Sequence, residues 1–193
     1  MGRILLPTGL AYAWRQLPDI VDAATRIRMM SGIRGRNTKP ELLIRSGLHR
    51  MGYRFRLHDR RLPGRPDLVF ASRRAVVEVK GCFWHGHECH LFRWPGTRQE
   101  FWQAKIAANI SRDIRNRDAL LGAGWRMAEV WECRLKGKER EPLDEVLARI
   151  AVFLEGRRER LVVGSDRTVR AEKAVKESLE KNNYPIKTSI SPN

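Results

Sequence analysis

The stretch PGRPDLVFASRRAVVEVKGCFWHGHEC, from Pro63 to Cys89, holds the residues around which the rest of the chain is organised. It contains two apolar, β-branched runs, DLVF and AVVEVK, separated by the short polar segment ASRR. Runs of this composition on either side of a short polar segment predict a β-hairpin. The second run ends in charged and metal-ligating residue types, so the sequence places candidate chemistry directly after a predicted strand.

One face of the second predicted strand is charged. Residues two apart in a strand share a face, so Glu78 and Lys80 point the same way. Asp67 opens the neighbouring strand and can bring its carboxylate close to Glu78. Two carboxylates with the main-chain carbonyl of Val79 would form an oxygen site suited to Mg²⁺, beside which Lys80 could orient or help deprotonate a water. The alternative is a solvated Glu–Lys pair, which would contribute little.

A second metal site is indicated by all three cysteines of the chain and a histidine. Three thiolates with one imidazole are a common tetrahedral zinc set. The alternative is that the cysteines pack as small apolar residues, and His85 and His90 are alternatives to the histidine in this set. The predicted zinc ligands are Cys82, His87, Cys89 and Cys133.

Large aromatic and basic residues near these sites suggest contact with nucleic acid. Phe83 and Trp84 lie in a glycine-rich turn and Trp102 lies near the start of a long helical pattern. They can pack on the core, or they can stack on or insert between bases. The arginines of RRLPGR and SRDIRNR are candidate phosphate contacts, which position a protein without reading sequence.

The wider pattern predicts an α/β chain with the order α, β, β, β, α, β and a final helix. Thr38 to Glu41 and Thr97 to Glu100 have the form of capping boxes that open helices. A further short helix is expected over residues 19–30. The main predicted elements are helices over 38–50, 97–121 and 142–155, and strands over 53–59, 67–70, 75–80 and 125–131.

Composition restricts the function classes. The 193 residues carry 38 Lys and Arg against 22 Asp and Glu, a net charge of +16, which indicates a polyanionic partner. No apolar run is long enough to span a bilayer, and the start of the chain lacks the pattern of a secretion signal. Three cysteines, an odd number, fit reduced thiols in a cytoplasm rather than a disulfide framework.

Four motifs in order resemble the very-short-patch-repair (Vsr) DNA mismatch endonucleases. They are PGRPDLVF, GCFWHGHEC, LFRWPGTRQEFWQAKIAANISRD and GWRMAEVWEC. The resemblance covers about residues 22 to 137. It implies a core like that of PD-(D/E)xK restriction endonucleases, with a mixed central sheet and a structural zinc site. It also implies nicking on the 5′ side of the thymine in T:G mismatches.

The resemblance also implies roles for individual residues. Asp67 would be the Mg²⁺ ligand and His85 the catalytic histidine, with Glu41 and Asp113 as supporting acids. The cysteines with His87 would bind zinc, and Phe83, Trp84 and Trp102 would wedge into the duplex. Members typically have Thr-His where this chain has Val79-Lys80, so whether Lys80 or His85 handles the proton stays open.

The sequence therefore predicts a Mg²⁺-dependent endonuclease domain over residues 19–156 that carries structural Zn²⁺. An N-terminal extension (1–18) and a basic, flexible tail (157–193) would flank this domain. We expect a cytoplasmic monomer that acts on T:G-mismatched duplex DNA alongside other mismatch-repair proteins. The alternatives are a restriction-type or broader mismatch nuclease and a zinc-stabilised DNA-binding module without cleavage.

Overall fold

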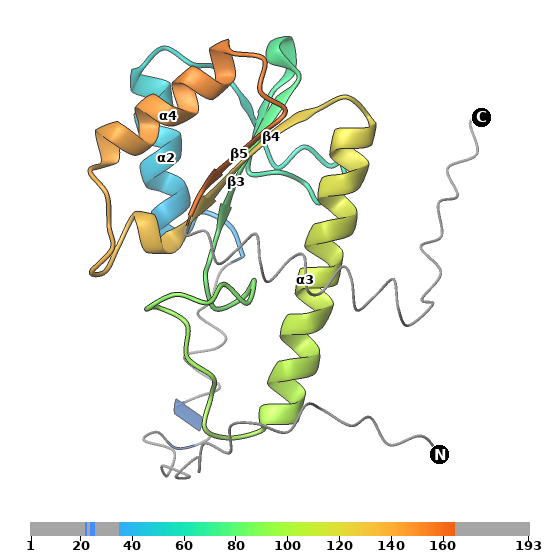
Figure 1. Cartoon of the computed structure of the whole chain (residues 1–193), viewed down its shortest axis with the longest axis vertical. Helices are drawn as coiled ribbons and strands as arrows, with labels where there is room; N and C mark the ends of the chain where they lie inside the picture. Colours follow the sequence, from blue (N-terminus) through green and yellow to red (C-terminus); the bar gives the residue numbers. More distant parts are fainter. Residues whose placement is uncertain (1–21, 23, 26–34, 165–193) are drawn as a thin grey trace, which may run out of the picture.

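A mixed five-stranded sheet organises the computed structural model, which describes residues 22, 24, 25 and 35–164 (Figure 1). Strands follow the order β1-β2-β3-β4-β5; β1–β2 and β2–β3 pair antiparallel, whereas β3–β4 and β4–β5 pair parallel. The strands are β1 (Arg56–Leu57), β2 (Leu68–Phe70), β3 (Ala75–Lys80), β4 (Arg126–Trp131) and β5 (Arg160–Val163), and the helices are α2 (Lys39–Arg50), α3 (Gln99–Gly122) and α4 (Leu143–Glu155). The predicted α/β class and mixed sheet are confirmed.

The predicted hairpin is present as β2 and β3. A 3₁₀ turn over Ala71–Arg73 joins them, and Arg74 closes it in the left-handed conformation with φ 44°. Leu68 pairs with Val77. Because the strands are antiparallel, Asp67, the residue before Leu68, lies opposite Glu78, the residue after Val77. The side chains of β3 alternate between the two faces of the sheet, as predicted, since Val76 and Val77 belong to different hydrophobic clusters.

Helices cover both faces of the sheet (Figure 1). On one face α2 and α4 pack side by side over a core that includes Ile44, Val77, Val130 and Ile150. On the other face α3 contributes Leu120 to a smaller cluster with Val69, Val76 and Met127. Beyond that small cluster the second face becomes polar, and there the candidate site lies.

The two predicted helix caps differ in outcome. The Thr38 hydroxyl accepts a hydrogen bond from the Glu41 main-chain N–H at 3.4 Å, so the first cap is confirmed. The second prediction is wrong: α3 begins after Arg98, which has φ 53° and provides no side-chain cap. Burial of one face of α3 by Ile106, Ile114 and Leu120 stabilises this helix instead.

Two strand predictions need correction. The strand predicted over residues 53–59 is reduced to Arg56–Leu57. Tyr53 and Phe55 still pack on the core, but through loop backbone. β5 was not predicted, and its residues had been assigned to the flexible tail; RLVV is too short, among charged neighbours, to show a period.

Several predictions lie outside the described residues. They are the extension over 1–18, most of the helix over 19–30, and the tail from residue 165. Within the described residues, none of the helices has the length and apolar character needed to span a membrane.

Two valines of α4 give a matched test of this packing. Val146 is fully buried and Val152 is 74% exposed on the same helix. Val146→Ala should lower the free energy of unfolding by about 2 kcal/mol, since two buried methyl groups are lost and a cavity remains. Val152→Ala should change it by less than about 0.5 kcal/mol. Urea denaturation measures both, and equal effects would contradict the placement of α4.

Candidate active site and metal cluster

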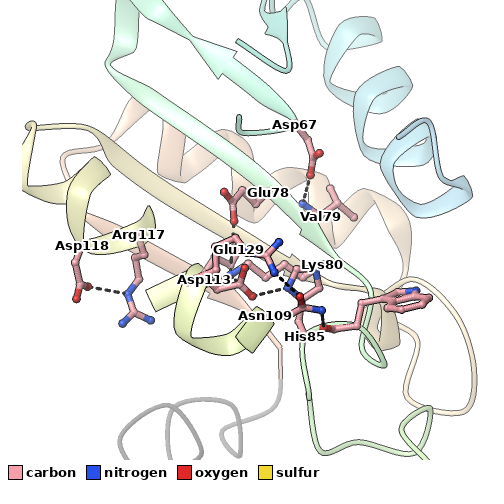
Figure 2. Close-up of polar contacts among 12 residues, drawn as sticks. Asp67, Glu78, Val79, Lys80, His85, Asn109, Asp113, Arg117, Asp118 and Glu129 are labelled. Atoms are coloured by element: carbon pink, nitrogen blue, oxygen red, sulfur yellow. Dashed lines mark hydrogen bonds and ion pairs between the residues drawn. The ribbon is translucent and has the colours of Figure 1, made fainter. Parts of the chain in front are cut away.

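A buried ionic network lies at the carboxyl ends of β3 and β4. Glu78 and Glu129 are register partners on these parallel strands, so two carboxylates sit side by side. The Lys80 ammonium lies 2.7 Å from Glu129 and 3.6 Å from Glu78. Arg160 of β5 binds the second oxygen of Glu129 at 2.6 Å. Figure 2 shows Lys80 among these acids, with Asp113 of α3 also near.

The network keeps Lys80 charged. Burial alone would lower the pKa of Lys80, but the charges of Glu129, Glu78 and Asp113 outweigh it and raise that pKa. Burial and then the charge of Glu129 are among the effects that raise the pKa of Glu78, although Lys80 opposes them. With only 3% of its surface exposed, Lys80 is better placed to hold its neighbours than to exchange protons with a substrate.

Asp67 faces a separate group of polar residues. Its Oδ2 accepts a hydrogen bond from the Val79 main-chain N–H at 2.8 Å, as drawn in Figure 2. His58 lies between Asp67 and Glu41, 3.6 Å from the former and 3.3 Å from the latter. Burial, followed by the charges of Glu41 and Glu78, raises the pKa of Asp67 to about 7. A bound cation would offset these effects, so the residues fit a divalent metal ion.

His85 and Asp113 form the third part of the site. His85 Nδ1 lies 2.5 Å from an Asp113 oxygen, and Lys80 Nζ lies 3.9 Å from the same oxygen. The imidazole is 28% exposed, in contrast to Lys80. A carboxylate on one ring nitrogen orients the ring and leaves the other nitrogen available for proton transfer.

These three groups share one cleft of about 370 Å³. Asp67, Glu78, Lys80, His85 and Asp113 all line it, so five of the six predicted catalytic residues meet there. Arginines of both segments predicted to contact phosphate also line the cleft: Arg60, Arg65 and Arg112. A second cleft shares Asp67, His85 and Asp113 and is lined by Glu41, which places Glu41 beside the first cleft rather than in it.

The predicted zinc ligands are gathered in one cluster. One ligand atom from each of Cys82, His87, Cys89 and Cys133 lies within 4.8 Å of the others. All three cysteines are free thiols. A hydrogen bond from Cys82 lowers the pKa of the Cys133 thiol to about 4, so one thiolate forms readily. The donor set and its spacing fit a tetrahedral metal ion.

Of the two alternative histidines, neither joins the cluster. His85 faces Asp113, and His90 lies 3.4 Å from Glu139. His87 instead stacks on Trp131 at a ring distance of 4.3 Å, which orients it toward Cys82 and Cys133.

The three predicted DNA-contacting aromatics also meet. Phe83 lies 5.2 Å from Trp84 and 5.3 Å from Trp102, measured between ring centroids. The loop that holds Phe83 and Trp84 passes close to α3, which carries Trp102: Gly86 of this loop has φ 61°, and a Cβ there would lie 2.8 Å from Ile106. Neighbouring aromatics extend the group, and sequence reasoning had not singled them out: Phe92, Trp94 and Phe101.

Comparison with known proteins identifies the family. The family model described as DNA mismatch endonuclease Vsr matches residues 18–91. The type II nicking enzyme V.XorIIP of Xanthomonas oryzae is 50% identical over 62% of this chain and 88% of its own length. The DNA mismatch endonuclease Vsr of Escherichia coli is 46% identical over 64% of this chain and 80% of its own. This chain belongs to the Vsr family.

The resemblance seen in the motifs is thus confirmed, and the chain is a DNA endonuclease of the Vsr family. A further Vsr-family relative, the type II nicking enzyme V.NmeAIP of Neisseria meningitidis, is 39% identical over 69% of this chain and 97% of its own length.

Sequence reasoning missed three residues of this Vsr-family site. Glu129 interrupts an apolar strand, the same signal that identified Glu78 and Lys80, and could have been found. Arg160 lies on the unpredicted strand β5. His58 falls within the strand predicted over residues 53–59, and no local pattern connects it to Asp67.

The metal cluster of this Vsr-family chain can be tested with two histidines close in sequence. His87→Ala should remove most of the tightly bound metal, because it deletes one of four ligands. His90→Ala should retain the metal, because His90 lies outside the cluster. Elemental analysis after extensive dialysis gives the metal content per chain. Equal retention in the two variants would contradict the assignment of His87.

Proposed function

We propose that this chain is a Mg²⁺-dependent endonuclease that nicks one strand on the 5′ side of the thymine in T:G mismatches. The printed names of its relatives support this, since one is a DNA mismatch endonuclease and several are nicking enzymes. The observation that carries the proposal is the cleft itself, in which Asp67 and the His85–Asp113 pair face a basic lining.

The residues divide the reaction between them. Asp67 and the Val79 carbonyl would hold Mg²⁺, with Glu78 as the further acidic ligand predicted from the sequence. When bound, the metal lowers the pKa of water and neutralises charge that develops on the phosphate. His85 carries the proton, because Asp113 orients it and its ring reaches solvent.

Lys80 has a positioning role in this scheme. Its ammonium is held by Glu129 and lies between Glu78 and Asp113. From this position the ammonium reduces the repulsion between the three carboxylates, and it holds the Asp113 side chain beside His85. The arginines of the cleft would bind the DNA backbone.

Two further features complete the proposal. Phe83, Trp84 and Trp102 would insert beside the mismatched pair, where stacking is weakest. Zn²⁺ would occupy the Cys82–His87–Cys89–Cys133 cluster and would tie the loop after β3 to the 3₁₀ turn after β4. Since His85 lies in that loop, the ion would hold the His85 side chain in a fixed position at the cleft.

A second candidate is a restriction-type nuclease that cuts matched duplex. It is favoured by Glu78 and Lys80, which give this chain an E-x-K strand end that typical Vsr members lack. A DNA-binding module without cleavage is the remaining alternative. A nicking assay on T:G and matched duplexes distinguishes both alternatives from the main proposal.

Asp67→Asn should lower the rate of nicking at least about a hundredfold on a labelled T:G duplex in Mg²⁺, because the metal loses its principal carboxylate. Asp144→Asn, on the exposed start of α4, is the matched control and should nick normally. Wild-type cleavage of matched duplex would favour the restriction-type alternative. Tight mismatch binding without cleavage would favour the non-cleaving module.

His85 and Lys80 can be separated by their pH profiles. His85→Gln should lower kcat at least about a hundredfold and flatten the limb of the pH–rate profile that reports the base. Lys80→Met should lower kcat less and leave the shape of the profile unchanged. If Lys80→Met alone removed that limb, Lys80 rather than His85 would handle the proton.

A further inference from the structure

Three side chains from separate elements converge beside the predicted Mg²⁺ site. Glu41 comes from α2, His58 from the segment after β1, and Asp67 from the residue before β2. One ligand atom from each lies within 4.8 Å of the other two. Two carboxylates and an imidazole at this spacing can close on one cation with small movements of their side chains.

Glu41 has a buried oxygen without a hydrogen bond. The residue is 2% exposed, and its Oε1 makes no hydrogen bond within the described part of the chain. Arg45 approaches this oxygen only to 3.7 Å. A buried carboxylate oxygen in this state is costly, and a cation held directly by the oxygen would remove the cost.

His58 faces the same point. Its Nε2 lies 3.3 Å from Glu41 Oε1, yet neither atom hydrogen-bonds within the described residues. Two such atoms at this distance, without the alignment of a hydrogen bond, are arranged as ligands of a third atom would be. The backbone of His58 is left-handed, with φ 48°, and its N–H donates to the Asp67 carbonyl at 3.4 Å. This strained conformation places the ring between the two carboxylates.

We propose that His58 is a direct nitrogen ligand of the metal held by Asp67, with Glu41 as a further oxygen ligand. Imidazole favours first-row transition metals, whereas Mg²⁺ prefers oxygen ligands. The site therefore binds Mn²⁺ or Co²⁺ in preference to Mg²⁺, although Mg²⁺ can still occupy it. This inference rests on the proposed function in one respect, the assignment of Asp67 to the catalytic metal.

The test uses Mn²⁺ as a paramagnetic probe on the full chain with its cysteine cluster loaded with zinc. Pulsed electron paramagnetic resonance of the Mn²⁺ complex should show coupling to a directly bound ¹⁴N nucleus. The coupling should disappear in His58→Gln and persist in His49→Gln, an exposed histidine on α2. Calorimetry should show Mn²⁺ affinity about tenfold weaker in His58→Gln, with a smaller change for Mg²⁺.

Two results would overturn the inference. One is a wild-type Mn²⁺ complex without ¹⁴N coupling, which would instead fit a protonated His58 that bridges two carboxylates; this readout needs no variant to fold. The other is coupling that survives in His58→Gln, which would assign the nitrogen to another residue. Nicking in Mg²⁺ that depends on Asp67, together with either result, would leave the proposed function intact. If ¹⁴N coupling is present but the protein does not nick DNA, the proposed function would fail and this inference would stand.

Discussion

The pairing of Lys80 with Glu129 is the interaction on which the site depends. Parallel pairing of β3 and β4 places Glu78 and Glu129 side by side in a buried layer, where two negative charges repel strongly. Lys80 and Arg160 compensate for both, and α3 can then bring Asp113 to the same place. Removing one member of such a network leaves buried charge unpaired, which costs far more than the loss of a surface ion pair.

The residues from Pro63 to Cys89 lie close together in the sequence, but the fold distributes them among three separate groups. Asp67 lies at the start of the β2–β3 hairpin and Lys80 at the end of β3, so the proposed metal site and the ionic network share a cleft. The loop after β3 then runs across to α3, where His85 meets Asp113. The Cys–His cluster joins this loop to Cys133 in the 3₁₀ turn that follows β4. Helices and strands therefore flank the groups proposed to act on the phosphate, as preorganised catalysis requires.

This arrangement explains how the chain accommodates Lys80 where typical family members have a histidine. Lysine in the place of the usual histidine would be an unpaired charge in an apolar layer, but Glu78 and Glu129 pair with it in this chain. Arg160 in turn binds the second oxygen of Glu129. The substitution is thus one part of a set of charges that must be considered together. His85 is connected to that set only indirectly, since its direct partner is Asp113, and an oxygen of Asp113 lies 3.9 Å from the Lys80 ammonium.

The sequence by itself determined the hairpin, the three helices, the three cysteines of the candidate metal cluster and the acids at the end of β3, because each follows from local period, composition or spacing. It could not supply β5 or the cap of α3, where short segments carry little periodic signal and packing outweighs propensity. Only the tertiary structure decided which groups meet. His58 approaches Asp67 and Glu41, and Arg160 approaches Glu129, through contacts between elements far apart in the chain. Distances between such elements depend on how whole faces pack, and no local pattern of residues records them.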